Sequence, residues 1–331
     1  MALSPRFLTR RQLLRAGTLA PLAGAAVFAP AAVQAQAFPS RPIRLVIPFA
    51  AGGLTDKYAR YMAEEMAKVL GGTMVVENRP GAAGALAAQA VARSAPDGTA
   101  LLFSAAAPLA VLPYIRPSGY EFTDFTPVGL AMAINTSLAA RSDFPANNLQ
   151  EFVALAKQNP GKYTYGHSGM GGMAHLSMAL LESDAGIRLV PVPYAGDSIS
   201  MPDFLEGRTD LSTSSYSTLL PHIKAGTVKM LTQFGQSRAP GMENVATAQE
   251  SGYPRSSNGS WFAIEAPAGT PEAIVQRLNA AMVAACRTPR IREQAQTDGV
   301  NVIGSSVQQY VDFVAKERQT WGPLVKKLNI Q

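Results

Sequence analysis

The chain reads Ile43-Arg44-Leu45-Val46-Ile47-Pro48-Phe49-Ala50-Ala51-Gly52-Gly53-Leu54-Thr55-Asp56 where a short apolar run meets a glycine pair and a helical pattern begins. The run predicts a buried strand, and the turn predicts a helix whose first backbone amides have no partner. Such amides lie at the positive end of the helix dipole and favour anions. Because neither a P-loop lysine nor Gly-x-Gly-x-x-Gly is present, the pattern favours a carboxylate over a nucleotide.

Residues 1–37 have the features of a secretory signal peptide. They contain four arginines and no acidic residue, then an apolar stretch and small residues that end at Ala37. The adjacent Arg10 and Arg11 also fit a twin-arginine signal, and a general export signal is the alternative. Under either interpretation we predict a periplasmic protein whose leader is cleaved near Ala37.

Composition excludes several function classes. Without the leader's four arginines the formal net charge falls from +6 to +2, so the charge does not indicate a nucleic-acid partner. The single cysteine, Cys286, cannot form an internal disulfide and lies in an alanine-rich helical pattern, which predicts a buried structural thiol. The three histidines match no metal-binding spacing, so we expect neither a metal nor a cofactor.

Strand and helix patterns alternate along the chain from residue 43 onward. Strands are expected at 43–47, 74–76 and 100–104, with helices at 58–70 and 82–93 between them. This order predicts an α/β fold with a parallel, doubly wound sheet. Ligands bind beyond the carboxyl ends of such strands, so we expect the loops at 50–56 and 104–108 to lie close together.

A second α/β unit follows the first. A helix is expected from the N-cap Asn148, with Glu151 in a capping box, and strands are expected at 163–165, 189–194, 209–215, 228–234 and 261–264. The last strand returns to the first unit. We therefore predict lobe 1 from 38–139 and 262–331, and an inserted lobe 2 from 140–261. Crossings near 138–140 and 260–264 would join the lobes across a cleft, as in hinge-closing receptors.

Several motifs together carry a family resemblance. They are the opening stretch from Pro42, Val75-Val76-Glu77-Asn78-Arg79-Pro80-Gly81, Ala95-Pro96-Asp97-Gly98, Asn159-Pro160-Gly161-Lys162, Val192-Pro193-Tyr194, Leu220-Pro221-His222-Ile223-Lys224-Ala225-Gly226 and Ala266-Pro267-Ala268-Gly269-Thr270-Pro271. The chain resembles, over essentially its whole mature length, the substrate-binding receptors of tripartite tricarboxylate transporters, the Bug-type extracytoplasmic receptors.

This resemblance implies a two-lobe periplasmic binding protein of class II that closes like a flytrap. Such receptors capture small carboxylates and deliver them to a membrane permease with one large and one small subunit. We expect a monomer with a small carboxylate ligand, no nucleic-acid partner and no enzymatic activity.

The chain departs from the family pattern in two places. The family usually has Pro-Gly-Gly where this chain has Ala51-Gly52-Gly53. A strand that often ends in Asp-Asn beside the cleft here reads Ser212-Thr213-Ser214-Ser215-Tyr216. Because hydroxyls replace an acid and an amide, the ligand of a relative cannot be transferred to this chain.

The resemblance also implies that backbone amides and small hydroxyls of the cleft loops hold the ligand carboxylate, often through ordered waters. The expected ligand-binding residues are Ala51, Gly52, Gly53, Leu54, Thr55, Asp56, Ser104, Ala105, Ala106, Ser168, Gly169, Met170, Gly171, Gly172, His175, Tyr194, Ala195, Gly196, Ser198, Ser214, Ser215 and Tyr216. The contact ranges 51–55, 104–107, 168–172, 195–198 and 214–216 also include Ala107 and Asp197.

Some of these residues have a second interpretation. Asp56 either caps free amides in the first turn of its helix or meets a ligand, for example an ammonium group. His175 either faces the cleft or packs in the core. Met170 and Met173 either line the pocket or fill gaps in the core.

Two alternative functions remain open. The segment 166–172 invites an esterase interpretation, but the nucleophile motif Gly-x-Ser-x-Gly fails because its fifth position is Met170. An exported serine hydrolase would use Ser168 as nucleophile, His222 as base, and Asp184, Asp197 or Asp210 as the third member. The other alternative is a receptor that reports ligand occupancy to a sensor kinase.

Overall fold

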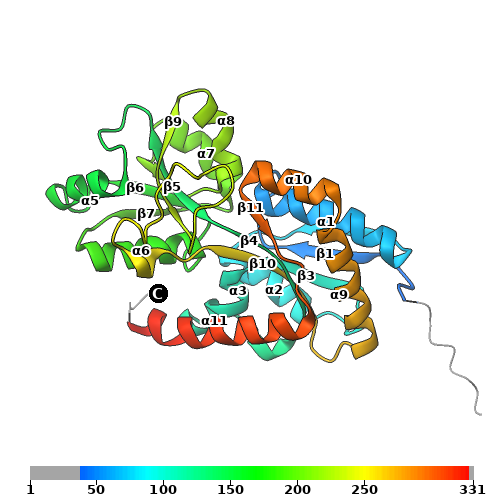
Figure 1. The fold of residues 1–331 in the computed structure, drawn as a ribbon. Coiled ribbons are helices and arrows are strands. Elements are labelled where there is room, and N and C mark those ends of the chain that lie inside the picture. Colours follow the sequence, from blue (N-terminus) through cyan, green and yellow to red (C-terminus); the bar gives the residue numbers. More distant parts are fainter. Residues whose placement is uncertain (1–37, 328–331) are drawn as a thin grey trace, which may run out of the picture. The chain divides into compact units, whose positions relative to one another are not determined.

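The computed structural model describes residues 38–327, so the predicted leader lies outside the described residues. The described residues belong to one compact unit. It contains a six-stranded and a five-stranded sheet, each flanked by helices (Figure 1). In the described part of the chain, none of the helices combines the length and the apolar character needed to cross a bilayer.

The first sheet has the strand order β11-β4-β10-β3-β1-β2. Its strands are β1 (Ile43–Ile47), β2 (Met74–Asn78), β3 (Ala100–Ala105), β4 (Phe125–Ile134), β10 (Ser260–Pro267) and β11 (Val300–Val302). Strands β1, β2 and β3 are parallel, whereas β10 and β11 run antiparallel to their neighbours. The prediction of a purely parallel sheet was therefore wrong, because β4 and β10 carry the chain to and from the second sheet in opposite directions.

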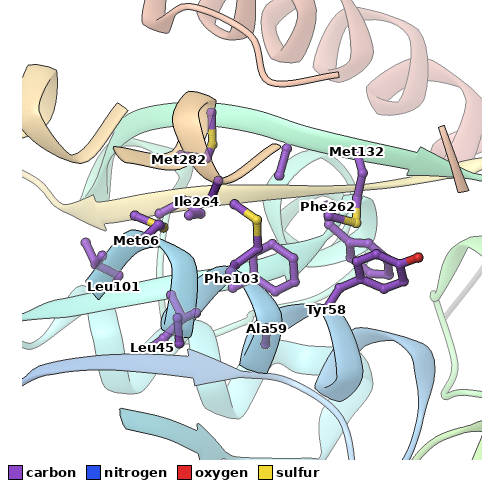
Figure 2. Packing of buried hydrophobic residues seen from close by; sticks show 14 of the residues in the cluster. Leu45, Tyr58, Ala59, Met66, Leu101, Phe103, Met132, Phe262, Ile264 and Met282 are labelled. Atoms are coloured by element: carbon purple, nitrogen blue, oxygen red, sulfur yellow. The ribbon is translucent and has the colours of Figure 1, made fainter. Parts of the chain in front are cut away.

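Alternating residues of the first sheet face two helical layers. The helices of this part are α1 (Leu54–Leu70), α2 (Ala85–Ala92), α3 (Ala106–Ala110), α4 (Leu112–Ile115), α9 (Glu272–Cys286), α10 (Pro289–Asp298) and α11 (Val307–Lys327), with the 3-10 turns η1 (Ala82–Gly84) and η2 (Phe122–Asp124). Leu45 belongs to the buried cluster that also contains Tyr58 of α1 and Met282 of α9 (Figure 2). Val46 faces the opposite way, toward α2, α3 and α11. Both faces of the sheet are thus buried.

The core against α1 and α9 is dense. Tyr58, Met66 and Phe103 have no exposed surface, and the rings of Phe103 and Phe262 stack with centroids 5.6 Å apart (Figure 2). Burying a side chain of this size stabilises a fold by about 1.5–3 kcal/mol. Cys286 is buried against the same layer, which confirms the predicted structural thiol.

The second sheet has the order β7-β6-β8-β5-β9. Its elements are β5 (Thr136–Arg141), α5 (Leu149–Gln158), β6 (Thr164–His167), α6 (Met173–Ala185), β7 (Val190–Pro193), α7 (Asp197–Leu205), β8 (Leu211–Ser212), α8 (Tyr216–Lys224), β9 (Val228–Phe234) and η3 (Pro254–Ser256). The Asn148 cap is confirmed, since its side chain accepts from the Glu151 N–H at 2.9 Å. The Glu151 carboxylate accepts from the backbone N–H of Asn147 and from the side-chain amide of Asn148, so the expected bond to the Asn148 backbone N–H is not formed. The strand expected at 209–215 is only two residues long.

The chain passes between the sheets twice. It leaves the first sheet at Asn135, between β4 and β5, and returns through 235–259, between β9 and β10. The Asn135 side chain ties both passages together, donating to Gln233 Oε1 at 2.8 Å and to the Ser237 carbonyl at 2.7 Å. Residues 138–140 and 260–264, where the crossings were expected, lie inside β5 and β10, so each passage precedes its expected position.

Candidate ligand-binding site

A cavity of about 70 Å³ lies where loops of the two sheets meet. Room of this size holds roughly five water molecules, which is the scale of a small organic acid. Its walls are Phe49, Ala50, Gly53, Leu54, Thr55, Ala83, Ala105, Ala107, Ile134, Thr136, Ser168, Gly172, Met173, Ala174, Gly196, Asp197, Thr213, Ser215, Ser260 and Phe262. The loops after β1 and β3 share this cavity, which confirms that they lie close together.

The N-termini of several helices converge on the cavity. The N-cap residues of α1, α3, α6, α7 and α8 all line it, and they are Gly53, Ala105, Gly172, Gly196 and Ser215. None of the five uses its side chain as a cap. Within residues 38–327, the backbone N–H groups of Leu54 and Thr55 meet no acceptor. The positive ends of the helix dipoles therefore point at an enclosed space, an arrangement that favours an anion.

Loops from the two sheets touch around the cavity. The Ala50 N–H donates to the Ala195 carbonyl at 3.4 Å, and Ser198 Oγ donates to the Ala51 carbonyl at 3.1 Å. Gly169 lies against η1, where an added Cβ would approach Ala83 Cα to 3.1 Å. These contacts describe a closed cleft.

The segment η1 has an unusual backbone. Ala82 and Ala83 both have positive φ, 50° and 53°, a region that costs a non-glycine residue roughly 1–2 kcal/mol. The helix expected from residue 82 therefore begins only at Ala85. The strain lies where Ala83 meets both the cavity and Gly169.

Small hydroxyls provide most of the side-chain polarity of the cavity. Thr136 Oγ1 is buried and has no partner, whereas Thr213 Oγ1 donates to the Gly166 carbonyl at 2.8 Å. Among the described residues that line the cavity, Asp197 is the one charged side chain, and no lysine, arginine or histidine is present. A bound anion would thus be held by amides and hydroxyls and not by a cation.

Two carboxylates near the site have different surroundings. Asp56 accepts from Arg60 Nη2 at 2.8 Å and from Asn78 Nδ2 at 3.0 Å, and it does not line the cavity. Asp197 lines the cavity and accepts from the Ser215 N–H at 2.8 Å. Desolvation raises the pKa of Asp197, and the hydrogen bonds from Ser215 offset this only in part.

The predicted site residues fall into three groups. Those that line the cavity are Gly53, Leu54, Thr55, Ala105, Ser168, Gly172, Gly196 and Ser215. Four others line an adjoining pocket of about 310 Å³, and they are Gly169, Met170, Tyr194 and Ala195. Arg116 also lines this second pocket. Those that line neither are Ala51, Gly52, Asp56, Ser104, Ala106, Gly171, His175, Ser198, Ser214 and Tyr216. His175 instead accepts from the Gly171 N–H and stacks on His167, with ring centroids 4.9 Å apart.

Ala107 and Asp197, which lie in the predicted contact ranges 104–107 and 195–198, also line the cavity. Other residues line it although the sequence did not predict them as ligand contacts. They are Phe49, Ala50, Ala83, Ile134, Thr136, Met173, Ala174, Thr213, Ser260 and Phe262. Ile134, Thr136, Ser260 and Phe262 belong to β4, β5 and β10. They were missed because ligand contacts were expected in loops at strand ends and helix starts, not in the strands that join the two sheets. Met173 lines the pocket, which is one of the two roles predicted for it. Asp197 directly follows Gly196 in the sequence, and both line the cavity.

The groups proposed for a serine hydrolase have other partners. Asp184 pairs with Arg255, and Asp210 accepts from the Thr164 N–H at 2.8 Å. Within the described part of the chain, no hydrogen bond joins Ser168 to His222 or His222 to an acid. The geometry therefore supports binding and gives no assembled triad.

An inter-sheet cavity lined by helix N-termini, in two linked α/β units, defines the class of periplasmic solute-binding receptors. A family description, "Tripartite tricarboxylate transporter family receptor", matches residues 58–330, and the chain belongs to this family. The description names its members as receptors.

Solved structures with similar sequences have the same fold. Periplasmic binding protein BugD is 33% identical with a TM-score of 0.81, covering 89% of this chain and 99% of BugD. MatC from Rhodopseudomonas palustris with bound malate is 32% identical with a TM-score of 0.81, covering 87% of this chain and 100% of MatC. A further R. palustris protein, solved with adipate, is 30% identical with a TM-score of 0.83. The match covers 88% of this chain and 99% of that protein.

Proposed function

We propose that this protein binds a small organic carboxylate in the cleft and delivers it to a tripartite tricarboxylate-type membrane permease. One observation carries the proposal, the convergence of five helix N-termini without side-chain caps on one cavity. The malate and adipate bound to the two R. palustris relatives are of the proposed ligand class.

The energetics of amide binding are sufficient for a receptor. Each charge-assisted hydrogen bond to a carboxylate contributes about 1.5–3 kcal/mol. Because the N-termini belong to helices of both sheets, a bridging ligand interacts with the closed cleft more strongly than with an open one. That difference in affinity would drive closure, and no covalent chemistry is required.

The organisation that goes with this function is also proposed. Lobe 1 comprises 38–139 and 262–331, and lobe 2 comprises 140–261. A leader of residues 1–37 takes the chain to the periplasm and is removed near Ala37. The receptor acts as a monomer and meets the large and small subunits of the permease when ligand-loaded.

Binding is tested with the mature protein. Its melting temperature is recorded against di- and tricarboxylates, aromatic acids and acidic amino acids, and hits are quantified by calorimetry. A receptor is stabilised in proportion to the logarithm of ligand excess, by about 2.7 kcal/mol at a hundredfold excess over Kd. If every acid leaves the melting temperature unchanged, the proposal is wrong.

Two further measurements separate the alternatives. Ester turnover that disappears in Ser168→Ala would support an exported hydrolase in place of a receptor. Growth on the identified ligand is then compared with and without the permease genes. If growth on the ligand is lost without the permease genes, delivery to the permease is supported. If uptake is unchanged without them and the ligand alters transcription, a receptor for a sensor kinase is supported.

A further inference from the structure

Asp197 places a negative charge inside a cavity otherwise suited to anions. It is the one charged side chain of the described residues that line the cavity. It follows Gly196 at the first position of α7, and its Oδ2 accepts from the N–H of Ser215, the N-cap of α8. The acid of the protein itself thus takes up one of the helix-terminal donors that a ligand carboxylate could use.

The two sides of the cavity therefore differ in charge. On the first-sheet side, the amides of Leu54 and Thr55 at the start of α1 meet no acceptor among the described residues. On the second-sheet side, the corresponding place at α7 and α8 holds the Asp197 carboxylate. A ligand that spans the cavity meets donors at one end and an acceptor at the other.

A ligand whose charged groups are all carboxylates fits this arrangement poorly. Two carboxylates brought together in one cavity repel each other. The side chain of Asp197 is half-buried, and no cationic side chain of the described residues lines the cavity to offset that repulsion. The Asp56 carboxylate forms a salt bridge with Arg60. No salt bridge to Asp197 is found in the described part of the chain, where its carboxylate accepts from the Ser215 N–H. A cationic group on the ligand would supply the counter-charge that the cavity walls do not.

We infer that the ligand carries a positively charged nitrogen that pairs with Asp197, in addition to the carboxylate held by the α1 amides. The ligand class is then a zwitterion of the amino-acid type. This inference rests on the proposed function, because it assumes that the carboxylate end binds in the same cleft.

The test uses ligand pairs that differ only in an amino group. Aspartate is compared with succinate, glutamate with glutarate, and phenylalanine with 3-phenylpropanoate, each titrated calorimetrically into the mature protein at pH 7.5. In the pair whose length fits, the amino member is expected to bind about 30-fold more tightly or better, the loss typical when one partner of a buried charge pair is removed. This comparison needs no variant.

Asp197→Asn then assigns the effect to one residue. The amide keeps an oxygen that accepts from Ser215 but carries no charge, so affinity for the amino member is expected to fall about 30-fold or more. Affinity for the deaminated member is expected to stay or rise. Asp143→Asn is the matched control, since its side chain is 80% exposed in the second-sheet part of the chain.

The outcomes separate the inference from the proposed function. If succinate, glutarate or 3-phenylpropanoate binds the wild type as tightly as its amino partner, the inference falls and carboxylate binding stands. The inference also falls, with carboxylate binding intact, if a folded Asp197→Asn protein binds the amino member unchanged. If no member of any pair binds, the inference is overturned, and the full panel of acids then decides the proposed function.

Discussion

Asp56 holds the glycine turn in place, since its Oδ2 accepts from the Gly52 N–H at 3.0 Å. The same carboxylate receives hydrogen bonds from Arg60 and Asn78, and Asn78 Nδ2 also donates to the Phe49 carbonyl at 3.0 Å. Burial alone would raise the pKa of Asp56, but these bonds outweigh it and hold that pKa below its ordinary value. The acid thereby links helix α1 and strand β2 to the loop that lines the cavity.

Replacing Asp56 should therefore weaken binding without removing a ligand contact. We expect Asp56→Ala to unfold about 1–3 kcal/mol more easily, because Gly52, Arg60 and Asn78 lose their common acceptor. Ligand affinity should fall several-fold through disorder of the loop. Thermal denaturation and calorimetry measure the two effects, and a variant with wild-type stability would contradict this role of Asp56.

Gly169 should control closure of the cleft. It has a φ of +110°, and an added Cβ would meet Ala83 Cα at 3.1 Å. We expect Gly169→Ala to reduce ligand affinity by about tenfold or more, because the loops cannot approach as closely. Gly161→Ala is the control, since it has a φ of +72° and no atom within 4 Å of its added Cβ. Equal affinity losses in the two variants would assign the effect to backbone strain alone.

Thr136 offers a hydroxyl without a partner to the cavity. We expect Thr136→Val to keep the shape of the wall and to reduce ligand affinity about tenfold, the contribution of one hydrogen bond. The unliganded protein should be equally stable or slightly more stable, because a buried polar atom is removed. A loss of stability without a change in affinity would show that the hydroxyl serves the fold.

Glu265 should make stability depend on pH. It is fully buried in β10, accepts from the Tyr310 hydroxyl at 2.7 Å, and burial raises its pKa to about 7. Between its usual value near 4.5 and about 7, the folded protein holds a proton that the unfolded chain releases, so stability contributed by this group falls as pH rises through that window. Glu265→Gln should remove this fall in stability, because the amide does not titrate. Denaturation of the wild type and of the variant as a function of pH measures the difference.

The stacked histidines should have the opposite pH dependence. Neither ring nitrogen of His167 has a hydrogen-bond partner among residues 38–327, and burial lowers the pKa of both His167 and His175 to about 4. Below about pH 6.5 the unfolded chain binds protons that the folded protein does not, so stability is lost as pH falls toward 4. His167→Phe should flatten this acid branch, and denaturation between about pH 4 and 7 checks it. If the variant loses the same stability as pH falls toward 4, groups other than His167 cause that loss.

Local patterns predicted much of the architecture. The helix starting near Gly53, its end at Gly71 and the cap at Asn148 follow from residues adjacent in sequence, because capping and left-handed turns depend on a few neighbouring backbone groups. The strand at 228–234 was predicted with its observed bounds. The directions of β4 and β10 were not predictable in this way, since strand direction depends on partners far along the chain.

The sequence by itself determined that the glycine turn after β1 precedes a helix with free amides, and hence that this loop favours an anion. Only the tertiary structure decided which acid faces the cavity. Asp56 and Asp197 both lie in the first turn of a helix after a glycine loop, but Arg60 and Asn78 turn Asp56 toward the fold, whereas no cation is placed beside Asp197 in the described chain. Charge pairing depends on residues brought together by packing, and this is why spacing along the chain could not distinguish the two.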